Sequence, residues 1–522
     1  MSNKIFCFFT VFLLFFTFTL IAAEYFVDSH RGSDQAFGTS EDHAWQSLER
    51  VNRANLNPGD IVRFARGGLW RGSLKPKSGT AGAPITYTCY GSDDLPKPRI
   101  YGSKSLNRPT DWVKVDTRLW CTVEAITAPL HGTLSDVGNL IFNGNRVGVK
   151  CWSKEQLQAE GHFWFDSETR CVWLVSVYNP TEIYDEIEAA LRHDHIVNLI
   201  NVHHVVISDF DVRYGAAHGI CGGASAYITI RNCDISWIGG GHQFTRPDGI
   251  PVRYGNGIEL WNNVHDYLIE GCRLWEIYDA ALTNQGNGKN EQRNITYQNN
   301  VIWNCEYSFE YWNRPEESIT DNITFMNNFC FNAGYGWGHT QRPVPNGRHL
   351  MFYANTAKTT NVLITNNVFS YATDSFLWVD NPITWTEQLF MNDNVIIQQL
   401  GKGQHLVRWQ NARIYIFKIY QNITGKDLNS SFYNNWSSYV LDKHFAVHVE
   451  LKAVYTPTLM LADLNAQLSD EFEWVNPSTQ LSVGDNQRYQ ATYTDPSGIP
   501  EPVTGYITVN VAKTDCSYGI SK

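Results

Sequence analysis

One pattern recurs in the middle of the chain, as NITYQNNVIW (294–303), NITFMNNFCF (322–331) and NVLITNNVFS (361–370). Each copy holds a short β-rich run, a turn built on Asn, and a second apolar run, and YITIRNCDIS (227–236) and YLIEGCRLWE (267–276) precede them. The turn residues are spaced by 39, 28, 28 and 39 residues, and the nearest copy upstream, at Asp209, lies 23 residues away. Repeats of this length with variable additions are typical of a solenoid with loops on one face. Because the apolar runs lack helical spacing, we predict an all-β fold, a right-handed parallel β-helix.

The turn position of this repeat is Asn in most copies, including Asn299, Asn327 and Asn366. Asn tolerates the left-handed backbone conformation, and its amide can form a hydrogen bond with the equivalent Asn on the next coil. We therefore predict stacked Asn ladders at these three positions.

Composition restricts the classes of function. The 522 residues contain 41 Lys and Arg against 52 Asp and Glu, a net charge of -11, which argues against a nucleic-acid partner. A hydrophobic content of 43% excludes a largely disordered chain. There is no P-loop and no nucleotide-binding glycine motif, and in the run RHDH (192–195) strand alternation separates Asp194 from both His residues, so we predict no cofactor and no metal.

The N-terminus predicts export from the cell. Residues 1–23 contain one early charge, an apolar run and a final Ala-Ala, which is typical of a signal peptide cleaved after Ala23. The alternative is a membrane anchor, because the apolar run is nearly long enough to span a bilayer. We expect a secreted protein, extracellular or periplasmic, with no membrane contact after cleavage.

The repeat also divides the chain into segments. A helical-looking piece at 45–54 is suited to cover the open end of the solenoid. The predicted segments are an N-terminal cap with the first coils (24–104), an inserted β-rich subdomain (105–190), the main β-helix with the active-site groove (191–400), and the last coils with a C-terminal β-rich cap (401–522). For the C-terminal tail, a separate small β-module is the alternative.

Several segments together resemble a known superfamily. LIFNGNRVGVKCW (140–152), FWFDSETRCVWL (163–174), RYGNGIELW (253–261) and EIYDAALTNQG (276–286) look like segments of the pectate-lyase-like superfamily of β-helical carbohydrate enzymes. Within it, the layout is similar to secreted bacterial glycoside hydrolases, including the β-xylosidase type, which inserts a β-domain early in its helix. The resemblance covers roughly residues 24–385.

Three segments align as equivalent strands on consecutive coils: 256–263, 280–286 and 308–315. Strand alternation then points Glu259, Thr283 and Glu310 outward in one column, with Trp261 and Trp312 beside them. It points Ile258, Leu260, Leu282, Phe309 and Tyr311 inward. Four positions earlier, Asp279 and Glu306 form a second outward acidic column.

Glycoside cleavage normally needs two carboxyl groups, so these columns are candidate catalytic residues. We predict Glu310 as the general acid, because Tyr311 and Trp312 can desolvate it and raise its pKa. Asp279 is one coil away, about 4.8 Å, which suits a retaining pair, whereas Glu259 is two coils away, about 9.5 Å, at the edge of an inverting pair. Both partners remain open.

The resemblance implies the same acid. In the β-xylosidase-like pattern the acid Glu lies on a strand that ends in Asn-x-Pro, as FEYWNRP does here, and the nucleophilic Asp shortly precedes Gln-Gly. Gln285-Gly286 is present, but the position aligned with that Asp is Ala281, and Asp279 stands two residues earlier. This departure leaves the retaining mechanism open.

Further residues are candidates for binding substrate. Aromatic rings stack on the apolar faces of sugars, and arginines bind carboxylates or hydroxyls. The candidates beside the acidic columns are Trp261, Trp312, Trp337, Arg253, Arg314 and His339. We predict a secreted glycoside hydrolase acting on a plant or algal cell-wall polysaccharide or its oligosaccharides; the alternatives are a polysaccharide lyase acting on a uronic-acid polymer, and a non-catalytic carbohydrate-binding β-helix.

Overall fold

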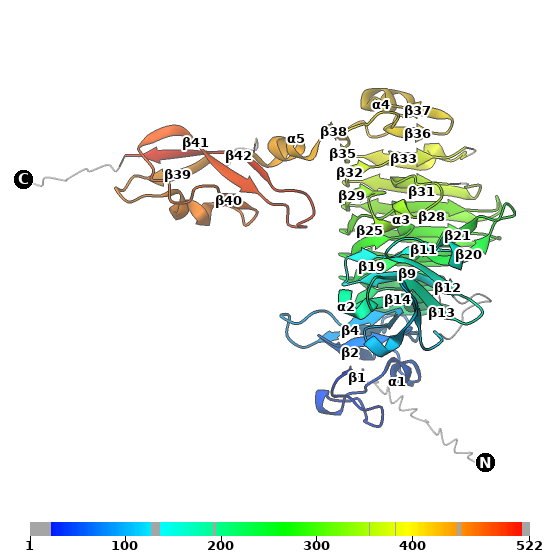
Figure 1. Ribbon diagram of the computed structural model, residues 1–522. Coiled ribbons are helices and arrows are strands. Elements are labelled where there is room, and N and C mark those ends of the chain that lie inside the picture. Colours follow the sequence, from blue (N-terminus) through cyan, green and yellow to red (C-terminus); the bar gives the residue numbers. More distant parts are fainter. Residues whose placement is uncertain are drawn as a thin grey trace, which may run out of the picture.

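The main body of the protein is a parallel β-helix (Figure 1). The computed structural model describes residues 22–126, 136–191, 195–353, 355–381, 383–445 and 450–513. Parallel strands of successive coils stack into a 17-stranded and a 10-stranded sheet, and the pairing of neighbouring coils is parallel throughout the central part of the chain. The predicted β-helix is confirmed.

Each central coil contributes three strands, and the strands of successive coils stack into three faces. The β24 face consists of β24 (Ala280–Gly286), β27 (Tyr307–Asn313), β30 (Arg348–Phe352), β33 (Ser375–Val379) and β36 (Val407–Trp409), preceded by β15 (Val197–Ile200) and the first halves of β18 (Ile220–Arg231) and β22 (Ile258–Glu270). The β25 face consists of β16 (His203–Ser208), the second halves of β18 and β22, β25 (Glu291–Gln298), β28 (Ile319–Met326), β31 (Lys358–Thr365) and β34 (Leu389–Asn392).

The β26 face is the 10-stranded sheet. Its central strands are β17 (Asp211–Arg213), β19 (Asp234–Ile238), β23 (Arg273–Ile277), β26 (Val301–Trp303), β29 (Phe329–Ala333), β32 (Val368–Ala372), β35 (Val395–Ile397) and β38 (Ser431–Tyr433). The core runs along the solenoid axis, because equivalent inward residues stack from coil to coil. Ile258, Leu282, Phe309, Leu350 and Leu377 form one such fully buried column.

An Asn ladder joins the coils between the β25 and β26 faces. Asn299, Asn327 and Asn366 have φ values of 56°, 55° and 56°, so the turn residues adopt the expected left-handed conformation. The predicted ladder positions are wrong by one residue, because the left-handed residue turns the chain and the next side chain points inward. Asn300 Nδ2 donates to Asn328 Oδ1 at 3.0 Å, Asn328 Nδ2 to Asn367 Oδ1 at 3.1 Å, and Asn367 Nδ2 to Asn394 Oδ1 at 3.0 Å.

We expect Asn328→Ala to lower the free energy of unfolding by about 2–4 kcal/mol. The substitution leaves the buried Asn300 Nδ2, the Tyr297 carbonyl and Asn367 Oδ1 without a partner from position 328. Urea denaturation followed by circular dichroism measures the change. Asn327→Gly is the control, because glycine adopts a positive φ without steric cost; similar losses in both variants would contradict the role of the ladder.

The N-terminal end carries a short helix and the first coils. Helix α1 (Leu48–Asn52) lies within the predicted helical piece and at the N-terminal end of the solenoid (Figure 1). Strand β1 (Glu24–Val27) precedes this helix, and the strands that follow it are β2 (Ile61–Ala65), β3 (Leu69–Arg71), β4 (Ile85–Tyr90) and β5 (Arg99–Tyr101). The predicted signal peptide lies outside the described residues, apart from its last two. Within the described ranges, no helix has the length and apolar character needed to cross a bilayer.

Residues between β5 and β15 form two further sheets. The first contains β6 (Ser103–Ser105), β9 (Val137–Phe142), β10 (Arg146–Val147) and β14 (Ile187–Leu191). The second contains β7 (Trp112–Asp116), β8 (Leu119–Thr122), β11 (Val149–Cys151), β12 (His162–Asp166) and β13 (Cys171–Val175). The two sheets share an apolar core separate from that of the solenoid. This inserted subdomain contacts the hairpin of β20 (Gly241–Thr245) and β21 (Pro251–Tyr254) near the candidate site.

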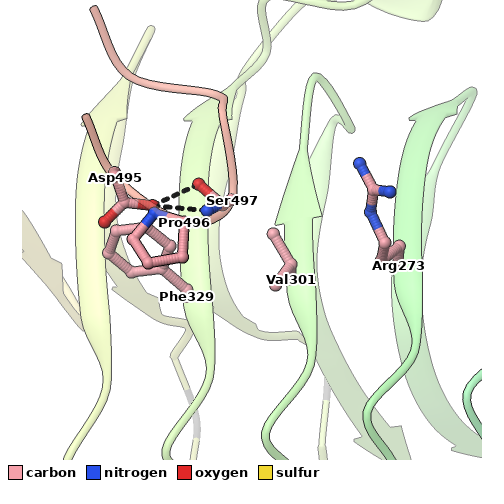
Figure 2. A pocket seen from close by; sticks show the side chains of 6 residues that line it. All are labelled: Arg273, Val301, Phe329, Asp495, Pro496 and Ser497. Carbon is pink, nitrogen blue, oxygen red and sulfur yellow. Dashed lines mark hydrogen bonds between the residues drawn. The ribbon is translucent and has the colours of Figure 1, made fainter. Parts of the chain in front are cut away.

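The C-terminal tail forms a separate β-module rather than a cap. Its sheet contains β39 (Glu450–Val454), β40 (Phe472–Trp474), β41 (Gly484–Tyr493) and β42 (Val503–Ala512), and it has its own apolar core. The module lies beside the solenoid, whereas α4 (Phe417–Thr424) and β37 (Ala412–Ile414) lie at the end of the last coil (Figure 1). Where the module meets the β26 face, Arg273, Val301 and Phe329 line a cavity of about 480 Å³ together with Asp495, Pro496 and Ser497 (Figure 2).

Candidate functional site

The predicted acidic column exists on the β24 face. Glu259 of β22 is in register with Thr283 of β24, which is in register with Glu310 of β27. The five apolar residues predicted to point inward belong to the solenoid core. Trp261 and Trp312 flank the two glutamates on the same face, and their ring centroids are 5.5 Å apart. The strand register predicted from the sequence is therefore confirmed.

Glu310 lies in an environment that favours its protonated form. The residue is only 6% exposed, and Gln285 Nε2 donates a hydrogen bond to Glu310 Oε2 at 2.6 Å. Burial raises the pKa of Glu310 well above its ordinary value, and the nearby negative charges of Asp279 and Glu259 add to this effect. The hydrogen bond from Gln285 and the charge of Arg342 oppose the rise without cancelling it. A carboxyl group of this kind can donate a proton near neutral pH.

Glu259 lies in an environment that favours its ionised form. His218 Nδ1 is 2.5 Å from Glu259 Oε2, and Asn256 Nδ2 donates to the same oxygen at 3.3 Å. Burial alone would raise the pKa of Glu259, but His218, with help from His195 and Asn256, lowers it below the ordinary value. Glu259 is thus suited to accept a proton.

A cavity of about 390 Å³ opens beside Glu259. Its lining residues are His195, Ile200, His218, Cys221, Gly223, Ala224, Gln243, Glu259, Trp261, Asn262 and Asn263. The cavity combines an ionisable pair, Glu259 and His218, with the aromatic side chain of Trp261. Such a combination of a concave surface, one aromatic wall and a few polar groups is typical of a small-molecule or sugar site.

The second acidic column forms a network of ion pairs around Arg342. Arg342 Nη2 is 3.2 Å from Asp279 Oδ1, and Arg342 Nη1 is 3.7 Å from Glu306 Oε1. His339 Nδ1, from the predicted substrate-binding set, is 3.0 Å from Glu306 Oε2. Burial, with a contribution from Glu306, raises the pKa of Asp279, although Arg342 opposes the rise. Glu306 is fully buried in this network, whereas the side chain of Asp279 is 23% exposed.

Two predicted substrate-binding residues, Arg253 and Trp337, are buried and make hydrogen bonds within the protein. Arg253 is 7% exposed, and it donates to the Gly240 carbonyl at 2.7 Å, the Gly138 carbonyl at 2.8 Å and Gln341 Oε1 at 3.0 Å. Trp337 is 6% exposed and donates from Nε1 to the Glu276 carbonyl at 2.9 Å. Trp337 is the first residue of α3 (Trp337–Thr340), and both side chains pack against the inserted subdomain: Trp337 through Ile141 and Ala190, and Arg253 through the Gly138 carbonyl.

Arg314 remains a candidate for contact with substrate. Its guanidinium lies 4.6 Å from the ring centroid of Trp312, so the cation and the indole form one surface next to Glu310. The Nε of Arg314 is buried and has no hydrogen-bond partner among the described residues. A buried donor without a partner is unusual, and a bound hydroxyl or carboxylate would satisfy it.

Sequence reasoning missed Arg342, which lies in a loop outside the repeat and whose charge acts on Asp279 and Glu310. The His218 partner of Glu259 also comes from a loop, the one before β18. Strand alternation predicts the side-chain direction of strand residues only, so it cannot place these loop residues. Among the described residues, no group of three or more His, Cys, Asp and Glu side chains is placed to hold a metal ion; residues 192–194 of the RHDH run lie outside the described ranges.

We expect Glu310→Gln to stabilise the protein at neutral pH. The folded-state pKa of Glu310 is raised above the ordinary 4.5, so the folded protein holds this proton more tightly than the unfolded chain. The contribution of the Glu310 proton to the free energy of unfolding is therefore fully present below about pH 4.5, and it is lost as the pH rises through the folded-state pKa. Gln cannot ionise, so the gain in Tm should be larger at pH 7.5 than at pH 4, measured by differential scanning fluorimetry. The exposed Glu317→Gln is the control; an equal gain for Glu310→Gln at both pH values would contradict the raised pKa.

Comparison with known proteins gives local and distant similarities. No family model matches the chain. A lacto-N-biosidase of Bifidobacterium longum subsp. longum is 39% identical over 89 residues, which are 16% of this chain, and the matched stretch spans 6% of that protein.

Similar solved structures include three carbohydrate-related proteins. A glycoside hydrolase has a TM-score of 0.46 at 11% identity, covering 79% of this chain and 96% of its own. A GH136 lacto-N-biosidase from Eubacterium ramulus has a TM-score of 0.39 at 12% identity, covering 79% of this chain and 68% of its own. The complex of XylC with xylose has a TM-score of 0.39 at 10% identity, covering 91% of this chain and 89% of its own.

Proposed function

We propose that the protein is a glycoside hydrolase in which Glu310 is the general acid and Glu259 the general base. The observation that carries this proposal is that the pKa values of two carboxyl groups in one column of the β24 face are shifted in opposite directions. Burial keeps Glu310 protonated, while His218 keeps Glu259 ionised. Two neighbouring carboxyl groups with pKa values driven apart are the usual arrangement for acid and base catalysis at one site.

The spacing of the two glutamates supports an inverting mechanism. They are two coils apart, which corresponds to about 9.5 Å, the separation that leaves room for a water molecule between base and sugar. The charge of Asp279 also acts on Glu310, but Arg342 already binds the Asp279 carboxylate. In this proposal Asp279 is a positioning residue, since its negative charge helps to keep Glu310 protonated.

The proposed reaction uses both carboxyl groups in one step. Glu310 donates its proton to the glycosidic oxygen as the bond between that oxygen and the anomeric carbon breaks. Glu259 accepts a proton from the water that attacks the anomeric carbon from the opposite side, and His218 stabilises the charge on Glu259 before the transfer. The contacting rings of Trp261 and Trp312 provide one aromatic surface for stacking of a sugar ring beside the cleavage point.

The sequence similarity to a lacto-N-biosidase, although local, supports a carbohydrate-active enzyme. We propose a polysaccharide or oligosaccharide as the substrate. We also propose that the protein is secreted, which rests on the signal-peptide pattern of residues 1–23. A secreted hydrolase would meet extracellular glycans directly.

Product analysis tests the proposed reaction. The purified mature protein is incubated with xylan, pectin, rhamnogalacturonan and fucose-containing glycans, and the products are followed by a reducing-end assay and by absorbance at 235 nm. New reducing ends without absorbance at 235 nm, released as the inverted anomer in an early proton NMR spectrum, are expected. Unsaturated products would show that the protein is a lyase and not a hydrolase. Products with retained anomeric configuration would indicate Asp279, and not Glu259, as the partner of Glu310.

A further inference from the structure

A group of arginines lies on the β24 face beyond Glu310. The register runs from Glu310 to Met351 of β30, Trp378 of β33 and Arg408 of β36, so Arg408 stands three coils from Glu310 in the same column. At about 4.8 Å per coil, the two residues are roughly 14 Å apart along the solenoid. A saccharide bound along this face from Glu310 toward the C-terminal coils would reach these arginines.

Two of the arginines pack against Trp378, and one of them is not neutralised. The guanidinium carbons of Arg348 and Arg408 are 4.0 Å and 4.7 Å from the ring centroid of Trp378. Arg348 Nε is 2.6 Å from Asp374 Oδ2, so that charge is paired. In the described ranges, no carboxylate lies within 4.0 Å of the Arg408 guanidinium.

Arg413 adds a second unpaired charge directly beside Arg408. β36 and β37 are antiparallel, and Arg408 is the direct partner of Arg413, so both side chains project from the same face. Like charges in this position repel each other and weaken the pairing of the two strands. The described part of the chain offers Arg413 no acidic partner, although the whole chain carries a net charge of -11. A bound anion would remove the repulsion.

His405 borders the same group and adds no charge of its own. It is 6% exposed, and its Nε2 has no hydrogen-bond partner among the described residues. Burial lowers the pKa of His405; the charge of Asp374 opposes this effect, and those of Arg413, Arg408 and Arg348 reinforce it. The histidine is therefore neutral near pH 7, and Asp374 is the one acid that pairs with any of the three arginines in the described ranges.

We propose that Arg408 and Arg413, next to Trp378, form a subsite for an anionic group, the carboxylate or sulfate of an acidic saccharide. The planar, always charged guanidinium groups are suited to oxyanions, and two of them on one face can hold a single anionic group between them. This inference rests on the proposed function, because it treats the β24 face as the saccharide-binding face. The substrate would be an acidic polysaccharide that extends from Glu310 to Arg408.

Binding measurements on the full-length mature Glu310→Gln protein test the subsite without cleavage of the ligand. Polygalacturonate is compared with its methyl ester, and a sulfated galactan with its desulfated form, by isothermal titration at low salt. One of the two anionic polymers should bind at least tenfold more tightly than its neutral form, which also tells carboxylate from sulfate. Adding Arg408→Ala and Arg413→Ala should reduce its affinity to that of the neutral form.

The matched control removes two arginines from other parts of the same sheet. Arg231→Ala with Arg293→Ala, at the end of β18 and on β25, should keep the preference for the anionic polymer. Equal affinity for anionic and neutral forms, no binding of either anionic polymer, or a preference that survives the loss of Arg408 and Arg413 would each overturn the subsite. Failure of the proposed function would appear separately, as absence of hydrolysis by the wild-type protein while the binding preference persists.

Discussion

Replacing Glu310 by Gln is expected to lower kcat on an unactivated oligosaccharide by about 10³-fold, because the leaving oxygen then departs without a proton. Gln keeps the size of the side chain and an oxygen that can accept the hydrogen bond from Gln285. The loss should be much smaller on a dinitrophenyl glycoside of the same sugar, whose leaving group is stable without protonation. Initial rates on both substrates measure this difference.

The control for this experiment is Glu317→Gln, an exposed glutamate between β27 and β28. It should leave both rates within twofold of the wild-type values. Equal losses on the two substrates in Glu310→Gln would show that Glu310 acts in some other way than by protonating the leaving group.

Replacing Glu259 by Gln is expected to lower kcat by about 10²- to 10⁴-fold on both substrates alike. A base assists the attacking water, and a better leaving group does not replace that assistance. Because the pKa of Glu259 is lowered, the wild-type enzyme should keep activity at pH values below 4.5 and lose it only where Glu259 becomes protonated. The corresponding fall of kcat/KM at acidic pH should be absent in the variant. Stopped assays over a pH series measure both effects.

Glu270→Gln is the control for Glu259, since Glu270 lies on the same strand β22 but on the β25 face. The control should keep the wild-type pH profile. A Glu259→Gln variant that loses activity only on the unactivated substrate would assign Glu259 to leaving-group protonation and contradict the proposed roles.

The fold and the strand register could be predicted because the copies of the repeat can be aligned with one another within this one sequence. The alternation of apolar residues in IELW, ALTN and FEYW fixed which side of each strand faces the core, and the structure places Glu259, Thr283 and Glu310 in one column as expected. The Asn ladder was displaced by one residue, because the pattern shows where the chain turns but not which amide points inward. The resemblance to β-xylosidase-type hydrolases stays a prediction.

The site residues outside the repeat could not be predicted in the same way. Arg342 and His218 come from loops whose lengths vary between coils, so no register relates them to Asp279 or Glu259. Arg253 and Trp337 were expected on an open surface, because a residue that points out of a solenoid normally meets solvent. Here the inserted subdomain covers them, and Arg253 donates to the Gly138 carbonyl of that subdomain.

The Asn ladder ends on a residue that cannot extend it. Each amide donates to the next coil, and the last, Asn394 Nδ2, donates at 2.8 Å to Asp427 Oδ1, while Tyr420 donates to Asp427 Oδ2 at 2.8 Å. A carboxylate accepts hydrogen bonds but has no amide hydrogen to pass on. The series of coils therefore has a direction and ends at Asp427. Insertion or deletion of whole coils is compatible with this end only when it occurs upstream of Asp427.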